Sequence, residues 1–288
     1  MPKRRNDWGR SSQKRKGNTL GAEMSASAMQ LQKTNAGFNK EVIMNSMFLI
    51  LLLLSVPFAF AENGKMIQLQ SGDEKIAAYY VKPSVGGPFP GMIVIQEWWG
   101  LNDQIKGVAD RLAGEGYAAL AVDLYRGRVT ANPEEAHQYA SGLPEDRAMW
   151  DLKSSFAYLQ GETDITKNRI GSIGWCMGGG YSLRLAIEEP QLAACVVYYG
   201  RLATDPESLK KIQAPVLGIF GERDQAIPPD AVKKFETQMK SLEKDVRTHI
   251  YPGAAHGFFN ETGKAYNKSA AEDAWGRTTR FLAEFLKK

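Results

Sequence analysis

From about residue 66 onward the chain alternates short apolar runs with amphipathic segments, and this alternation limits its possible folds more than any other feature. The runs with strand character are Met66–Gln70, Ile76–Val81, Gly91–Ile95, Tyr117–Val122, Arg169–Trp175, Ala194–Tyr199, Pro215–Phe220 and Arg247–Tyr251. The segments with helical character are Asp103–Glu115, Pro133–Ser141, Glu145–Gln160, Gly178–Glu188, Pro229–Leu242 and Ala265–Leu286. Strands that alternate with helices predict a mostly parallel, doubly wound α/β sheet of about seven to eight strands. We expect the first two strands to form an antiparallel pair at its edge.

The first 61 residues have a different composition from the rest. Residues 1–46 carry a net charge of +6, whereas the remainder of the chain carries −2. This polar, basic leader cannot bury a core, so we expect it to be disordered. It could be a nucleic-acid-binding arm, or an extension upstream of a true start at Met44 or Met47. The body has no basic surplus, so no nucleic-acid partner is expected for it.

The apolar segment 47–61 has the character of a signal peptide. It is shorter than the roughly 20 residues that span a bilayer, and it ends in Ala59-Phe60-Ala61, the small-x-small pattern of a cleavage site. We therefore predict cleavage after Ala61 and export to the periplasm or the exterior, with no stable membrane span afterwards. An uncleaved N-terminal anchor is the alternative, because the nearest preceding positive charge is Lys40. Residues 62–288 are predicted to form one domain, and we expect a monomer.

A possible nucleophile lies between the strand at 169–175 and the helix that follows it. The segment reads Gly174-Trp175-Cys176-Met177-Gly178, which is the nucleophile-elbow pattern with cysteine in place of serine. Small residues on both sides of the nucleophile allow a tight strand-to-helix turn to close. The helix N-terminus then favours the thiolate form of Cys176, and the Met177 N–H is placed to donate to an oxyanion. A buried, structural cysteine in a glycine-rich turn is the other interpretation.

A thiol nucleophile needs a base and an orienting carboxylate, which in this kind of fold follow it in the order acid, then histidine. The chain has three histidines. His137 precedes the elbow and His249 falls inside a strand, whereas His256 follows the last strand, where an open α/β sheet places its site. The acid is expected in the loop after the preceding strand, where Asp224 is the first candidate and Glu222 its competitor.

Five short motifs together resemble the dienelactone hydrolase family, a branch of the α/β hydrolases. They are Gln96-Glu97-Trp98-Trp99-Gly100, Asp123-Leu124-Tyr125, Gly174-Trp175-Cys176-Met177-Gly178-Gly179, Gly221-Glu222-Arg223-Asp224 and Gly253-Ala254-Ala255-His256-Gly257-Phe258. The likeness spans residues 66 to 286 in the family's order. It implies the α/β-hydrolase fold and a triad of Cys176, His256 and Asp224.

The resemblance also assigns roles to residues around the triad. It implies that Glu97 contacts the resting thiol and helps to deprotonate it when substrate enters, and that the N–H groups of Met177 and Trp98 form the oxyanion hole. From the residues alone, Glu97 could instead be a structural carboxylate bonded to backbone or to an Arg. Trp98 and Trp99 are expected to wall the pocket, although one of them could pack in the core.

One departure from the family limits the choice of substrate. In dienelactone-cleaving members, cationic side chains hold the carboxylate of the substrate, and one lies a few residues after the catalytic histidine. Here Gly257-Phe258-Phe259-Asn260 supplies no cation at that place. The other cation would be Arg126 or Arg128, next to Tyr125, which is also expected to contact the substrate. A single arginine binds a carboxylate less well than a pair, so a neutral ester or another lactone is as good a candidate as dienelactone.

These features predict a carboxylic ester hydrolase that works through an acyl-enzyme on Cys176. No cofactor is expected, because the His and Cys residues do not have the spacing of a zinc site and no dinucleotide-binding glycine motif follows a strand. Cys195 is expected to be a buried apolar residue, too far from Cys176 for a disulfide. Two other classes of function remain open: a non-catalytic binding module on the same fold, and a thiol redox or peroxide sensor that uses Cys176.

Overall fold

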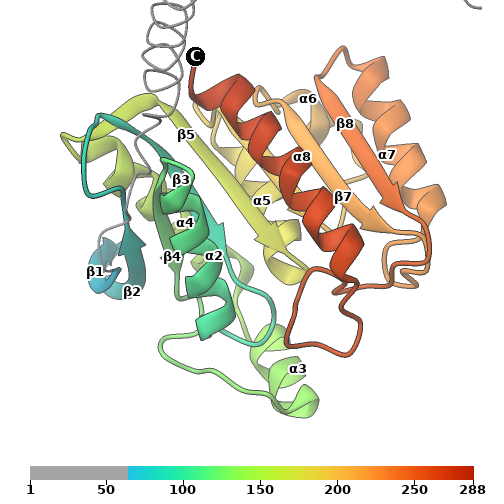
Figure 1. Cartoon of the computed structure of the whole chain (residues 1–288), viewed down its shortest axis with the longest axis horizontal. Coiled ribbons are helices and arrows are strands. Elements are labelled where there is room, and N and C mark those ends of the chain that lie inside the picture. The colour runs from blue at the N-terminus through green and yellow to red at the C-terminus, as the bar shows by residue number, and fades with distance from the viewer. Residues whose placement is uncertain (1–63) are drawn as a thin grey trace, which may run out of the picture. The chain divides into compact units, whose positions relative to one another are not determined.

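Eight strands form one sheet in the computed structural model, which describes residues 64–288. The strands are β1 (Lys65–Ser71), β2 (Glu74–Val81), β3 (Phe89–Ile95), β4 (Ala118–Val122), β5 (Ile165–Trp175), β6 (Ala194–Tyr198), β7 (Val216–Gly221) and β8 (Val246–Tyr251). Their order across the sheet is β1-β2-β4-β3-β5-β6-β7-β8 (Figure 1). The β1–β2 and β2–β4 pairs are antiparallel and all the others are parallel. The predicted fold class and the antiparallel edge pair are therefore confirmed.

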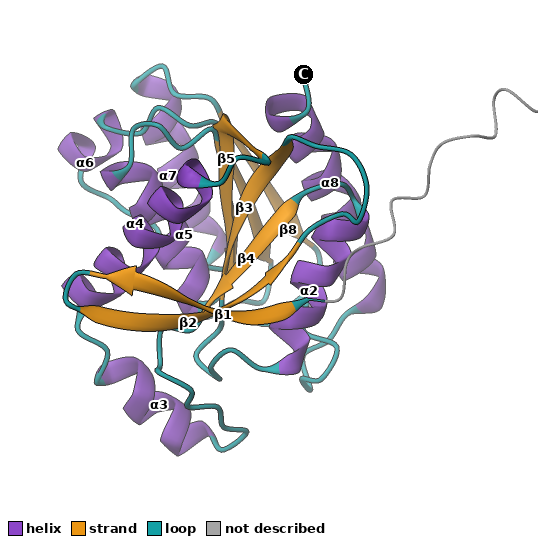
Figure 2. Ribbon diagram, turned by 90° about the vertical axis from the view of Figure 1, so that its left-hand side faces the viewer, coloured by secondary structure: helices purple, strands orange, loops and turns teal. Residues whose placement is uncertain are grey.

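Helices cover both faces of the sheet, because its central strands are apolar on both sides. The described helices are α2 (Asp103–Gly114), α3 (Pro133–Ser141), α4 (Glu145–Gly161), α5 (Met177–Glu188), α6 (Pro206–Lys210), α7 (Pro229–Ser241) and α8 (Lys268–Leu286). In β3, Ile93 and Ile95 point into the core shared with α4, α5 and α7, whereas Met92 and Val94 point into the core shared with α2 and α8. Figure 2 shows these two helical layers on opposite sides of the strands, with α3 apart from both.

The structure differs from the sequence prediction most clearly at the start of one strand, at the start of one helix and in one helix that was not predicted. The strand predicted from residue 169 begins at Ile165, because Ile165 pairs with Phe89 of β3. The last helix begins at Lys268 rather than at residue 265, because the Asn267 side chain accepts from the Ala270 N–H and caps it there. Helix α6 was not predicted, since its five residues are too few to show a helical period.

The predicted leader (1–46) and signal peptide (47–61) lie outside the described residues. Within residues 64–288, every helix is too short or too polar to cross a bilayer.

Candidate active site at the β5–α5 turn

Cys176 occupies a strained turn between β5 and α5, in the strand–turn–helix context that the motif predicts. Its backbone has φ 53° and ψ −117°, a region that non-glycine residues rarely adopt and that is concentrated at functional sites. Two neighbouring glycines make the turn possible. A side chain at Gly174 would collide with the carbonyl of Gly178, and a side chain at Gly178 would collide with the carbonyls of Ile95 and Gln96.

His256 is held by a buried carboxylate. Its Nδ1 lies 2.8 Å from Oδ2 of Asp224, whose side chain has no exposed surface. The other oxygen of Asp224 accepts from the backbone N–H groups of Ala226 and Ile227, at 2.9 Å each. Glu222, the competing carboxylate, is exposed and accepts from the Gly253 N–H instead. Of the two acids that the sequence left open, Asp224 is therefore the one in contact with His256.

The thiol of Cys176 is the second partner of His256. Burial opposes protonation of the imidazole, but hydrogen bonds to Asp224 and to Cys176 outweigh it and raise the pKa of His256 to about 10. The same His256 contact holds the pKa of Asp224 below its ordinary value, against the effect of burial. The imidazole thus lies between a carboxylate and a sulfur, and both favour its charged form.

The other two histidines lie elsewhere. His137 is exposed on α3, and the ring of His249 packs against Tyr251 within β8, with ring centroids 4.4 Å apart.

Glu97 is buried directly after β3 and is bonded to two neutral donors. Its Oε1 accepts from the Tyr199 hydroxyl at 3.1 Å, and its Oε2 accepts from Nδ2 of Asn260 at 2.7 Å. Burial raises the pKa of Glu97, although the two hydrogen bonds partly counter it. The sequence predicted a contact between Glu97 and the thiol, or a structural bond to backbone or Arg. The hydrogen bonds that the structure describes for Glu97 go to a tyrosine and an asparagine.

Tyr199 and Asn260 are functional-site residues that the sequence reasoning missed. The Tyr199 ring also packs edge-on against the His256 imidazole, with centroids 5.0 Å apart. The sequence could have indicated Tyr199, because it lies at the carboxyl end of a predicted strand, and ligands of open α/β sheets bind at those ends. The sequence indicated no role for Asn260, which belongs to the segment after His256 that lacks a cation.

A pocket of about 820 Å³ joins these groups. Glu97, Trp98, Trp99, Cys176 and His256 all line it. The remaining lining residues are Asn102, Thr130, Ala131, Pro133, Gly257, Asn260, Thr262, Gly263, Lys264 and Ala265. The two tryptophans contact each other edge-to-face at 4.9 Å, and both are partly exposed and form the pocket wall rather than the core. Apart from His256, Lys264 is the one cationic residue among these lining residues.

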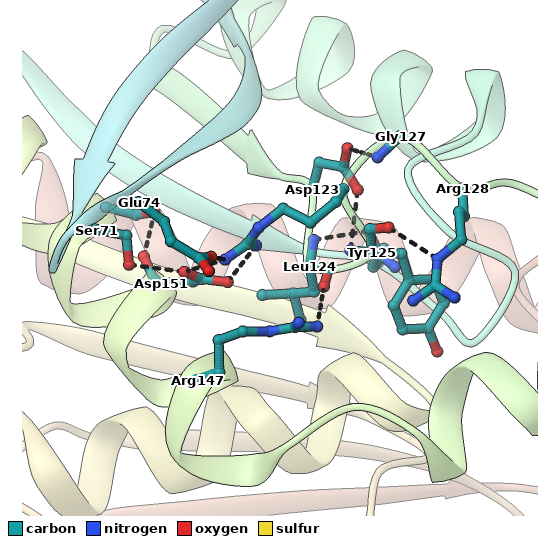
Figure 3. A network of polar contacts seen from close by, with 12 residues as sticks. Ser71, Glu74, Asp123, Leu124, Tyr125, Gly127, Arg128, Arg147 and Asp151 are labelled. Atoms are coloured by element: carbon teal, nitrogen blue, oxygen red, sulfur yellow. Dashed lines mark hydrogen bonds and ion pairs between the residues drawn. The ribbon is translucent and has the colours of Figure 1, made fainter.

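The pocket does not include the three residues that were expected to bind substrate beside it. Arg126 forms ion pairs with Asp151 and Glu74, and its backbone is left-handed (φ 58°). Arg128 stacks over the ring of Tyr139 at 4.6 Å. Tyr125 is fully buried. Figure 3 shows this region, in which Asp151 lies beside Ser71 and Glu74. The structure thus leaves Tyr125, Arg126 and Arg128 out of the lining of this pocket.

The two backbone N–H groups expected to form the oxyanion hole belong to different segments, the start of α5 and the loop after β3. Met177 is the first residue of α5, so its N–H has no acceptor within the helix. Trp98 directly follows Glu97 and lines the pocket.

Both described cysteines are free thiols. Cys195 is buried, and its sulfur donates to the Ser182 carbonyl at 3.4 Å. Within the described part of the chain, no cluster of three or more His, Cys, Asp or Glu side chains is placed to hold a metal ion.

Comparison with known proteins gives one consistent result. The sequence profile of the dienelactone hydrolase family matches residues 76–286. A protein of Saccharolobus solfataricus named "Putative carboxymethylenebutenolidase" is 34% identical and covers 77% of this chain and 99% of its own length. "Protein usf" of Aquifex pyrophilus is 32% identical, with coverage of 77% and 99%. The crystal structure titled "Putative Dienelactone Hydrolase" from Klebsiella pneumoniae is 27% identical, with a TM-score of 0.72 and coverage of 78% and 99%.

Proposed function

Because the chain belongs to the dienelactone hydrolase family of α/β hydrolases, we propose that it hydrolyses a small carboxylic ester or lactone with a triad of Cys176, His256 and Asp224. One observation carries this proposal. A thiol at the N-terminus of a helix and an imidazole fixed by a buried carboxylate face the same pocket. Such an arrangement supplies an activated nucleophile, its proton donor and the group that orients the imidazole.

The first half of the reaction forms an acyl-enzyme. The Cys176 thiolate attacks the carbonyl carbon, and the oxyanion that forms accepts from the N–H groups of Met177 and Trp98, each such donor being worth about 3 kcal/mol. The bond from carbon to the leaving oxygen then breaks. The leaving alkoxide takes a proton from the His256 imidazolium, which leaves a thioester on Cys176 and a neutral imidazole.

The second half regenerates the thiolate. His256, now neutral, takes a proton from water as the water attacks the thioester. The carbon–sulfur bond breaks, the acid is released, and the imidazolium and thiolate are restored. Asp224 holds Nδ1 throughout, so that Nε2 is the atom that exchanges the proton.

Glu97 has a supporting role in this proposal. A buried carboxylate with a raised pKa can take a proton from a neighbouring thiol at neutral pH. Glu97 lines the same pocket as Cys176. Where the resting sulfur is a thiol, a substrate that displaces Tyr199 or Asn260 from the carboxylate oxygens frees Glu97 to accept the thiol proton before the attack. Glu97 returns this proton to the sulfur once the acid has been released.

The pocket favours neutral substrates over anionic ones. Two tryptophans supply apolar walls, whereas both arginines near Tyr125 are engaged away from the pocket. The one other lining cation, Lys264, is exposed. We therefore expect kcat/KM to be about tenfold higher for p-nitrophenyl butyrate than for the hemisuccinate ester of the same phenol.

The proposal is tested by turnover of p-nitrophenyl butyrate. Cys176→Ala and His256→Ala should each lower kcat by about 10³-fold or more, and iodoacetamide should inactivate the wild-type protein. Cys195→Ala is the matched control, because its thiol is buried away from the pocket, and it should retain activity. Turnover that survives Cys176→Ala would reject the triad.

A thiol sensor is the second candidate, since Cys176 is a partly exposed free thiol beside the His256 imidazole. Under that function, Cys176 would react with hydrogen peroxide, and this reaction would persist in His256→Ala while no ester is hydrolysed. A binding module would keep its function in Cys176→Ala.

A further inference from the structure

A partly buried ion pair joins Arg126, in the turn after β4, to Asp151 in α4. The side chain of Asp151, in α4, is 1% exposed. Arg126 donates to both of its oxygens, from Nη1 at 2.6 Å and from Nη2 at 3.1 Å. The Ser71 hydroxyl donates to Oδ1 at 2.7 Å (Figure 3). Glu74 adds a third carboxylate oxygen at 3.1 Å from Arg126, but its side chain is largely exposed. The buried Asp151 carboxylate is therefore well satisfied, and bidentate pairing fixes the direction of the arginine.

Arg126 belongs to a turn with an unusual backbone. Arg126 and Gly127 are both left-handed, with φ of 58° and 88°. This backbone lets the Asp123 side chain accept from the N–H groups of Tyr125 and Gly127. An arginine rarely adopts such a conformation, and it persists only where surrounding contacts impose it. The bidentate pair with Asp151 is one such contact, beside the two hydrogen bonds that Asp123 accepts from the turn.

The turn at residues 123–130 reaches one side of the proposed oxyanion hole. The Tyr125 hydroxyl lies 3.2 Å from Sδ of Met177, as its donor. Tyr125 is the residue just before Arg126, and its ring is fixed edge-on against Tyr139. A shift of Arg126 would therefore move the hydroxyl that holds Met177.

The same turn also reaches the other side. The N–H of Thr130 donates to the Trp99 carbonyl at 3.0 Å, and the N–H of Leu124 donates to Oε1 of Gln96 at 3.3 Å. These two contacts bracket Trp98 in the sequence. In addition, Gly100 packs so closely on the Arg128 carbonyl that any side chain there would collide.

From this geometry we propose that Arg126 and Asp151 are positioning residues for the oxyanion hole: their ion pair sets the turn at 123–130, which holds Met177 on one side and the segment around Trp98 on the other. The inference rests on the proposed function, because it uses the same two N–H donors. Neither Arg126 nor Asp151 lines the pocket.

The test separates oxyanion stabilisation from thiol reactivity. Alkylation by iodoacetamide needs the thiolate but develops no oxyanion, whereas a trifluoromethyl ketone forms a tetrahedral adduct with Cys176 whose oxyanion needs the hole. The variants are Arg126→Ala and Arg126→Lys. Arg247→Ala is the matched control, because it removes a bidentate Arg–Glu284 pair on the surface. Each protein is assayed for p-nitrophenyl butyrate hydrolysis, for its Kd with phenyl trifluoromethyl ketone, and for its alkylation rate.

In Arg126→Ala we expect kcat to fall and the ketone Kd to rise, each by about 10- to 100-fold, while the alkylation rate stays within twofold of wild type. Arg126→Lys keeps the positive charge but loses the planar guanidinium that pairs with both Asp151 oxygens. Its kcat and ketone Kd should therefore lie between those of wild type and of Arg126→Ala. Arg247→Ala should match wild type in all three assays. If the ion pair only stabilises the fold, its loss would lower the melting temperature without raising the ketone Kd more than it changes the alkylation rate.

Removing Arg126 alone leaves a buried charge, so the double variant Arg126→Ala with Asp151→Asn guards against misfolding. It should show the same split with a melting temperature closer to wild type. Wild-type values of kcat and ketone Kd in either Arg126→Ala or the double variant would overturn the inference and leave the proposed function intact. A wild-type protein that neither hydrolyses the ester nor binds the ketone would reject the proposed function, and with it the oxyanion hole on which the inference depends.

Discussion

At the scale of single residues, His256 is defined by its two neighbours. Asp224 and Cys176 both favour its charged form, and they outweigh burial, which favours the neutral form. The balance differs from that of a lone imidazole, which is half protonated near pH 6.5. The thiol is therefore as much a part of the acid–base chemistry as the carboxylate.

This dependence predicts the titration of Cys176→Ala. Because the hydrogen bond and charge of Cys176 raise the pKa of His256, their removal should lower that pKa from about 10 toward its ordinary value. NMR titration of the imidazole Cε1 protons measures it directly, since the chain has only three histidines. Cys195→Ala is the control and should leave the titration unchanged. A pKa near 10 in Cys176→Ala would show that the thiol is not a partner of His256.

Asn260 supports a second prediction at this scale. It is a buried donor to the buried Glu97 carboxylate at 2.7 Å, so Asn260→Ala leaves one carboxylate oxygen without that partner. We expect the free energy of unfolding to fall by about 1–3 kcal/mol, measured by urea denaturation. The pKa of Glu97 should rise further, because this hydrogen bond lowers it.

Glu97→Gln supplies the control for that measurement. In the Glu97→Gln background the charge is gone, so Asn260→Ala should cost less than in wild type. Equal costs in the two backgrounds would mean that Asn260 does not act through the carboxylate.

The residues of the site differ in how far the sequence could predict them. Cys176 and His256 stand in local motifs whose spacing has a physical reason. The partners of Glu97 come from 102 and 163 residues along the chain, and no local pattern reports such a meeting. The contacts of Arg126 could not be predicted from the sequence either, since they involve a left-handed backbone and a carboxylate in α4.

At the scale of elements, the turn between β5 and α5 depends on backbone contact rather than on side chains. Gly178 lies against the carbonyls of Ile95 and Gln96, whereas an added methyl group at Gly180 would meet only Arg201, at 3.4 Å or more. Gly178 therefore has no room for a side chain, whereas Gly180, two residues further along the same helix, has room for a methyl group.

Substitution of these two glycines tests the turn. Gly178→Ala forces a methyl group into the backbone of β3 and should lower the free energy of unfolding by about 3 kcal/mol or more. Gly180→Ala, the matched control, should be neutral or stabilising by up to about 1 kcal/mol, because alanine is the better helix former. Thermal denaturation followed by circular dichroism compares the two. Equal stability of Gly178→Ala and wild type would contradict the tight turn.

Elements were predictable where burial forces a pattern. Parallel strands covered on both faces show as apolar runs, so β3, β4, β6 and β7 could be located from sequence. The start of β5 could not, because Ile165 joins the sheet only through its pairing with Phe89. Helix α6 depends on a cap from Asp205 and on the burial of a single residue, Leu209, which is too weak a pattern to predict.

At the scale of the whole molecule, the two helical layers leave the carboxyl ends of the parallel strands for chemistry. Glu97, Cys176 and Tyr199 follow the ends of β3, β5 and β6, and the loops after β7 and β8 carry Asp224 and His256. Five segments that are distant in sequence therefore converge at one edge, as strand order in an open α/β sheet requires.

Export is a separate proposal at this scale, and it concerns residues outside the described part of the chain. We propose that the chain is cleaved after Ala61, because Ala59-Phe60-Ala61 follows an apolar run shorter than a membrane span. Expression of the full chain in a bacterial host should yield a mature protein whose first residue, by mass spectrometry, is Glu62. Ala61→Leu should block cleavage and retain the precursor at the membrane, because the peptidase requires a small residue there. A chain that begins at Glu62 should keep the kcat and melting temperature of the cleaved protein, since every catalytic group proposed above lies between Glu97 and His256. Recovery of a mature protein that still contains residues 47–61 would favour the uncleaved anchor.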